Sequence, residues 1–281
     1  MELPAARTAQ WHGALADTVR AGVSTPALIK VWTIWLALAV LLAGNTAGVA
    51  STTENHAPGS SAQRSLYDGD DSPPWLLAVG RLQVPGIRYR DGRRRHYLED
   101  CSGTLVGTPG AVFVLTAWHC FADYRDLSQR ILFTLGDHEA GSLTSEAVKV
   151  ADGGGMHADW ALLRLTDPGV SALARPLRLS PTRGDPTRTI VMAGYSREPA
   201  RASDQRRLSY DPACRITAQR KATTESDCSA RKGASGGAVV QSLPGAEPVL
   251  LGVISEGDGN GISIYVPTAV FLGQVKSHLG H

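Results

Sequence analysis

The chain has 281 residues, of which 43% are hydrophobic and 19% are charged, and its formal net charge is +2. This length is enough for one large domain or two small ones with a sizeable core. The composition excludes a disordered chain, and the near-neutral charge excludes a protein that binds nucleic acid through bulk basicity. Only 3 Met against 30 Gly, with short punctuated segments, favours β structure over a helical bundle.

Residues 1–50 are typical of a secretory signal peptide. A mildly basic stretch is followed by the dense apolar run Val31–Ala43, and the small residues Gly48-Val49-Ala50 form a candidate cleavage site. No charge occurs between Lys30 and Glu54, so an uncleaved membrane anchor is the alternative. We therefore expect a secreted or periplasmic protein, with membrane contact only if this segment is retained.

Residues 51–72 are polar, without apolar periodicity, and we interpret them as a linker or pro-segment ahead of a domain over residues 73–281. Beyond residue 50 the basic and acidic side chains nearly balance. Charge therefore indicates no particular partner.

All the cysteines lie in the exported part of the chain, and four cysteines allow three pairings. They are Cys101, Cys120, Cys214 and Cys228. A bridge between sequence neighbours would stabilise the fold by ~3 kcal/mol on the loop-entropy model. Zinc is the alternative, but the chain contains no Cys-x-x-Cys motif, and we predict no metal and no cofactor.

Short apolar or alternating segments separated by Gly, Pro and Asp predict two sets of strands. The first set comprises Leu76–Gln83, His96–Val106, Ala111–Thr116, Ile131–Leu135, Glu146–Ala151 and Trp160–Leu165. The second set comprises Thr189–Tyr195, Arg207–Thr217, Gly237–Gln241, Pro248–Ser255 and Ile262–Val266. Between the first two strands, Asp91-Gly92 and Arg93–Arg95 are interpreted as a solvated hairpin turn. The end of the chain, Thr268–Leu279, has the pattern of a helix.

Three short segments carry candidate chemistry. They are Leu115-Thr-Ala-Trp-His119-Cys120, Asp159-Trp-Ala-Leu-Leu-Arg-Leu165 and Gly233-Ala-Ser235-Gly-Gly237. Singly, each has an ordinary structural explanation: a histidine beside a cysteine, a turn residue before a strand, a serine in a loop. Their order of His, Asp and Ser, with cysteines near the His and the Ser, favours a common function.

This set resembles the chymotrypsin-like (trypsin-like) serine peptidases over the domain at residues 73–281. Thr116-Ala-Trp-His119-Cys120, Asp159-Trp-Ala-Leu-Leu and Gly233-Ala-Ser235-Gly-Gly are similar to the three catalytic motifs of the family. The resemblance implies an all-β fold of two six-stranded antiparallel barrels, over residues 73–166 and 187–267, followed by the helix at 268–279. It also implies the disulfides Cys101–Cys120 and Cys214–Cys228, and the cysteine spacing is most similar to bacterial members.

The resemblance assigns roles that the chemistry requires. Ser235 would attack a peptide carbonyl, His119 would take its proton, and Asp159 would orient the imidazole. Backbone N–H groups of Gly233 and Ser235 would form the oxyanion hole. We expect a secreted endopeptidase acting on protein or peptide substrates, with substrate contacts from Ser229, Ser255, Glu256 and Gly257.

Two alternatives remain. Gly233-x-Ser235-x-Gly237 also fits the nucleophile elbow of an α/β-hydrolase esterase, but that fold needs a later acid and histidine and a helix after the serine. A binding protein built on the peptidase fold is possible in principle, because fold alone does not imply activity. Such proteins usually lack a triad member, whereas here all three candidates are present.

The chain also departs from the family's pattern. Members activated by cleavage carry an Asp just before the nucleophile, where it pairs with a buried N-terminal ammonium, and here that residue is Ala234. We therefore expect a preformed oxyanion loop and treat cleavage after Arg64 as optional. Ser229 stands where an Asp would select Arg or Lys, and Ile254 where a His would select Glu, so neither specificity is supported.

Overall fold

The computed structural model describes residues 64–69, 71–108, 111–136, 141–197, 206–242 and 245–279. All of them belong to one compact unit, Asn55–His281. The predicted signal segment, and residues 51–63 and 70 of the predicted linker, lie outside the described residues. Within the ranges described, no helix is long and apolar enough to span a membrane.

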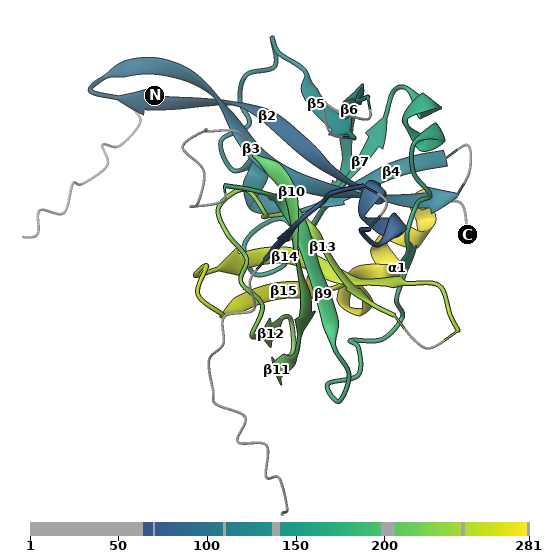
Figure 1. Ribbon diagram of the computed structural model, residues 1–281. Coiled ribbons are helices and arrows are strands. Elements are labelled where there is room, and N and C mark those ends of the chain that lie inside the picture. The colour runs from purple at the N-terminus through teal and green to yellow at the C-terminus, as the bar shows by residue number, and fades with distance from the viewer. Residues whose placement is uncertain are drawn as a thin grey trace, which may run out of the picture. The chain divides into compact units, whose positions relative to one another are not determined.

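The first half of this unit is a closed antiparallel barrel with the strand order β2-β3-β4-β7-β6-β5. Its strands are β2 (Val79–Arg90), β3 (Arg93–Thr108), β4 (Ala111–Thr116), β5 (Ile131–Leu135), β6 (Leu143–Asp152) and β7 (Ala161–Leu165). The β2–β3 hairpin runs out beyond the other strands (Figure 1). Its turn is Asp91-Gly92, both at positive φ, as a tight hairpin turn requires.

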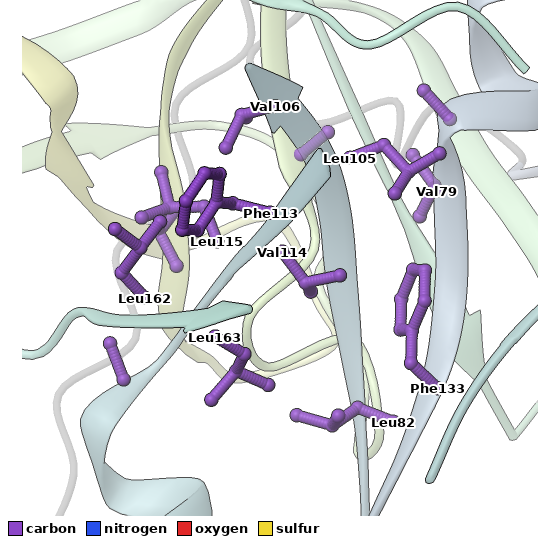
Figure 2. Close-up of a cluster of buried hydrophobic side chains, with 14 of the residues drawn as sticks. Val79, Leu82, Leu105, Val106, Phe113, Val114, Leu115, Phe133, Leu162 and Leu163 are labelled. Atoms are coloured by element: carbon purple, nitrogen blue, oxygen red, sulfur yellow. The ribbon is translucent and has the colours of Figure 1, made fainter. Parts of the chain in front are cut away.

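Alternating apolar side chains of these strands fill the barrel. Leu105 and Val114, cross-strand partners on β3 and β4, are fully buried, as are Phe133 of β5 and Leu163 of β7. Figure 2 shows these side chains clustered between the strands that carry them. Each fully buried side chain of this size contributes ~1.5–3 kcal/mol by removal from water, so the barrel is a stable platform for the loops at its ends.

The second half forms an open nine-stranded sheet with the order β1-β10-β9-β13-β14-β15-β12-β11, and β8 pairs with β14. Its strands are β1 (Ser65–Leu66), β8 (Arg178–Leu179), β9 (Ile190–Ser196), β10 (Arg207–Cys214), β11 (Ile216–Gln219), β12 (Thr224–Ser226), β13 (Ala238–Gln241), β14 (Val249–Gly257) and β15 (Ser263–Pro267). A closed barrel followed by a half-barrel sheet confirms the predicted fold class.

Helical structure is sparse among the described residues. Three short 3-10 helices, η1 (Pro74–Ala78), η2 (Trp118–Phe121) and η3 (Pro168–Ala172), connect strands. One α-helix, α1 (Thr268–Leu279), has the predicted bounds. Its Phe271, 1% exposed, stacks on Trp160 of the first half with ring centroids 4.8 Å apart. The C-terminal helix therefore packs against the residue that follows Asp159.

Several predicted elements need correction. Arg93–Arg95 are not part of the turn but paired residues of β3, opposite Arg90, Tyr89 and Arg88, with their side chains exposed. The single strand predicted over 207–217 is two strands, β10 and β11. The short strands β1, β8 and β12 were not predicted, so the second half holds more strands than the six expected. The end of the predicted linker is part of the sheet, because Ser65 and Leu66 pair with Tyr210 and Ser209.

Candidate active site

His119 and Asp159 lie together at the end of the barrel. The buried strand β4 leads directly into η2, which carries His119, and Asp159 immediately precedes Trp160 and β7, which pairs with β4. His119 Nδ1 lies 2.8 Å from Asp159 Oδ2, and the His119 backbone N–H donates to Asp159 Oδ1 at 2.8 Å. These two contacts fix the orientation of the imidazole ring. Nδ1 faces Asp159, and Nε2 is the ring nitrogen that Asp159 does not contact.

Asp159 is a fully buried carboxylate, 0% exposed, whereas the His119 side chain is 28% exposed. Ser255 Oγ of β14 also donates to Asp159 Oδ2, at 2.5 Å. Burial raises the pKa of Asp159, but the His119 and Ser255 hydrogen bonds and the histidine's charge outweigh it, so the net pKa is lowered. Burial lowers the pKa of His119, but the hydrogen bond and charge of Asp159 outweigh it, so the net pKa is raised. Asp159 is therefore ionised more readily than an ordinary carboxyl group, and His119 is a stronger base than an ordinary imidazole.

Ser235 lies in a tight turn between Arg231 and β13. The Ala234 N–H donates to Arg231 O at 2.9 Å, and the Gly237 N–H donates to Ala234 O at 2.8 Å. Gly236 has φ +82°, and a Cβ there would lie 2.2 Å from the Ser102 carbonyl oxygen. Only glycine fits both demands, because a side chain would be strained at this φ and would clash with backbone.

Ser102 of β3 connects this turn to the barrel. Its N–H donates to Ser235 O at 2.7 Å, and its buried Oγ donates to Gly233 O at 2.8 Å. The same Oγ accepts the Tyr195 N–H of β9 at 2.8 Å. In the described part of the chain, no protein group accepts a hydrogen bond from the N–H of Gly233 or of Ser235. Two backbone donors beside a serine hydroxyl are what an oxyanion hole requires.

The structure brings the serine turn next to the histidine segment but leaves one predicted contact unmade. A Cβ on Gly236 would lie 3.0 Å from the Ala117 nitrogen, two residues before His119. Between the described residues Ser235 and His119, however, there is no Oγ–Nε2 hydrogen bond. Such bonds are often long without substrate and tighten when the substrate binds. The Ser–His contact of the predicted triad therefore stays a prediction.

Both disulfides have the predicted pairing. Cys101 is bonded to Cys120 and Cys214 to Cys228. The first bridge joins the residue before Ser102 to the residue after His119, and the second begins the segment that leads to Ser235. Because Cys101 and Cys120 are bonded to each other, they offer no thiolate to a metal beside His119.

The predicted substrate-binding residues occupy two facing segments. Ser229 is buried, and its neighbour Ala230 packs against Gly257, where a Cβ would lie 2.5 Å from the Ala230 carbonyl oxygen. Ser255 points inward to Asp159, whereas Glu256 and Gly257 are exposed at the end of β14. A shallow groove runs along this end, lined by Glu256, Gly257, Asp258, Ile262 and Ile264.

Two residues that support the site had no recognisable signal in the sequence. Ser102 holds the serine turn, and buried Asp211 of β10 accepts the Ser229 N–H at 3.0 Å. Their partners are 131 and 18 residues away, so no local motif reveals them.

The barrel, the half-barrel sheet and the buried Asp–His pair define a peptidase of the double-barrel class. A comparison with protein families agrees, because the family described as "Trypsin-like peptidase domain" matches residues 101–245. This match covers just over half of the chain and contains His119, Asp159 and Ser235. The chain therefore belongs to the trypsin-like peptidase family, which acts on protein or peptide substrates. A search of curated proteins finds no match to this chain.

Proposed function

We propose that the chain is a secreted serine endopeptidase that hydrolyses peptide bonds through an acyl-enzyme on Ser235. The observation that carries this proposal is the buried Asp159 carboxylate, which accepts two hydrogen bonds from His119 and one from Ser255. Burying a carboxylate is costly unless it is paired. Paired with His119, Asp159 orients the imidazole and stabilises its protonated form.

The reaction begins when Ser235 Oγ attacks the substrate carbonyl carbon while His119 Nε2 takes the hydroxyl proton. The oxyanion of the tetrahedral intermediate accepts hydrogen bonds from the Gly233 and Ser235 N–H groups. His119 then gives its proton to the leaving nitrogen as the C–N bond breaks, which leaves an ester on Ser235. Water, deprotonated by His119, then attacks this ester. The bond between the acyl carbon and Ser235 Oγ breaks, His119 returns the proton to Oγ, and the acid product is released. Throughout, Asp159 keeps the Nδ1 proton in place.

Substrate recognition is proposed at the two facing segments beside this centre. Ser229 forms the floor of a specificity pocket, and Ser255, Glu256 and Gly257 form the wall that binds the substrate backbone. This assignment is supported by the close approach of Gly257 to Ala230, the residue after Ser229, which brings the segment of Ser229 beside the end of β14.

Replacing Ser235 with Ala in the full chain should lower peptide turnover by about 10⁶-fold, because triad members act as a unit. The measurement is the hydrolysis rate on a mixed peptide library, which also reveals the preferred cleavage sites. Ser277→Ala, an exposed serine of α1, is the matched control and should leave the rate unchanged. Turnover that survives in the Ser235→Ala protein would contradict the proposal.

Export is proposed from the apolar run Val31–Ala43 and the small residues that follow it, and two disulfides are consistent with an oxidising compartment. After expression of the full chain, the exported protein should begin at Ser51. N-terminal sequencing of the exported protein checks this. A product that retains residues 31–50 and stays with the membrane would favour the anchor alternative.

A further inference from the structure

Arg64, the residue before β1, reaches across the half-barrel sheet to the proposed pocket floor. Its Nη1 donates to the Ser229 carbonyl oxygen at 2.8 Å. Its Nη2 donates at 2.9 Å to both the carbonyl oxygen and the Oγ of Ser209 on β10. Ser229 and Ser209 are almost completely buried, at 2% and 0% exposed. One guanidinium therefore joins the N-terminal segment, β10 and the segment that leads to Ser235.

The Ser229 main chain is held by two side chains, Asp211 and Arg64. Its N–H donates to Asp211 Oδ2 at 3.0 Å, and its carbonyl accepts from Arg64. Asp211 is fully buried, and its Oδ1 has no hydrogen-bond partner among the described residues. The net pKa of Asp211 is raised, because burial outweighs the opposing effects of the Ser229 N–H and the positive charge of Arg64. The positive charge of Arg64 therefore offsets only part of the cost of burying this group.

The main-chain groups of the residues on either side of Ser229 have hydrogen-bond partners that do not involve Arg64. Ser263 Oγ of β15 donates to the Cys228 carbonyl at 2.6 Å and accepts the Ala230 N–H at 2.8 Å. Cys228 is bonded to Cys214 at the end of β10. The Ser229 carbonyl of this floor is held instead by Arg64, the residue ahead of β1.

We propose that Arg64 is a positioning residue for the specificity pocket, and that the segment carrying it is a retained part of the active enzyme. The inference rests on the proposed peptidase function. Ala234 leaves no acid beside the nucleophile to receive a terminal ammonium, and Arg64 provides a fixed cation to the same region without any cleavage. Hydrolysis of the Arg64–Ser65 bond would detach the guanidinium from β1, so cleavage there should impair the enzyme rather than be optional.

Kinetics on the full chain test this proposal. In Arg64→Gln the KM for substrates with a large side chain on the acyl side of the scissile bond should rise about tenfold or more, because a hydrogen bond to a charged group is lost. The kcat should change little, since Ser102 holds the serine turn through the carbonyl oxygens of Gly233 and Ser235. A substrate with glycine at that position does not reach the floor, and its KM should stay near that of the unmodified enzyme.

Two further variants separate positioning from general stability. Arg64→Lys keeps the charge but donates from a single point, so it should recover part of the lost affinity. Arg175→Gln removes an exposed arginine paired with Glu247 and should leave all constants unchanged. Equal effects of Arg64→Gln on the large and the glycine substrates, or no difference between Arg64→Gln and Arg175→Gln, would overturn the proposal.

Hydrogen exchange in an inactive variant tests the role of Arg64 independently of whether the chain is a peptidase. In a Ser235→Ala background, Arg64→Gln should speed amide hydrogen exchange in the peptide spanning residues 228–236 and leave the barrel strands unchanged. Unchanged exchange in that peptide would overturn the role of Arg64 even if the peptidase proposal holds. Sequencing of the active wild-type protein gives a second check: its N-terminus should lie before Arg64, and a fully active form that begins at Ser65 would contradict the proposal.

Discussion

At the residue scale, the imidazole of His119 gains its basicity from one neighbour. Burial alone would weaken this base, and the Asp159 hydrogen bond and charge reverse that effect. Three donors surround Asp159, so its charge is paired although the carboxylate is fully buried. Asp159 therefore orients the imidazole and stabilises its protonated form, which the proposed role of His119 as general base requires.

This balance predicts the pH dependence of catalysis. Only neutral His119 can accept the Ser235 proton, so kcat/KM should rise with pH through a midpoint above the ordinary pKa of histidine. In Asp159→Asn the burial effect remains and the raising effects are lost, so the midpoint should move to lower pH, and turnover should fall by about 10⁴-fold. The measurement is kcat/KM against pH, with Glu247→Gln as the exposed control. A midpoint that stays in place in Asp159→Asn would contradict this account of the pair.

At the scale of elements, β3 positions the serine turn that follows β12. Ser102 contacts Gly233, Ser235 and Tyr195, so a single side chain and its backbone link the barrel to the turn and to β9. Both Oγ contacts are buried and made to main-chain groups, which lose this hydrogen bond when the hydroxyl is removed. The geometry of the oxyanion donors therefore depends on a residue of the other half of the fold.

Ser102→Ala should lower the free energy of unfolding by about 2–4 kcal/mol, because two buried main-chain groups each lose a hydrogen bond. The kcat should also fall by about tenfold or more as the Gly233 N–H loses its fixed direction. Chemical denaturation and steady-state kinetics measure the two effects, with Ser142→Ala, an exposed serine, as the control. Normal kcat in a destabilised Ser102→Ala protein would separate stability from catalysis and contradict the proposed link.

The elements that could be predicted are those with a strong local pattern. β4 is an almost entirely apolar run and the bounds of α1 agree with the prediction, while β7 begins at Ala161, one residue after the predicted start. β12 has three residues and β1 is formed by pairing with a distant strand, so neither has a pattern long enough to detect. The same distinction applies to the site. His119, Asp159 and Ser235 lie in recognisable motifs, whereas Ser102, Asp211 and Arg64 act through main-chain groups far along the chain.

At the scale of the whole molecule, the candidate site depends on contacts between the two halves. Ser255 of the half-barrel sheet donates to Asp159 of the barrel, and α1 stacks Phe271 on Trp160 next to that aspartate. Leu177 adds a main-chain bond to Leu105 of β3 at 2.9 Å. In the proposed mechanism, the barrel supplies the base and its acid, and the other half supplies the nucleophile and the oxyanion donors.

The most direct test of this arrangement is covalent labelling of the full chain with an organofluorophosphonate, followed by peptide mass spectrometry. The reagent reacts with a serine whose proton is removed by a neighbouring base. We predict one label per chain, on Ser235, and its loss in His119→Ala. Peptide hydrolysis that continues with Ser235 unlabelled, or a label on Ser235 that persists in His119→Ala, would contradict the account.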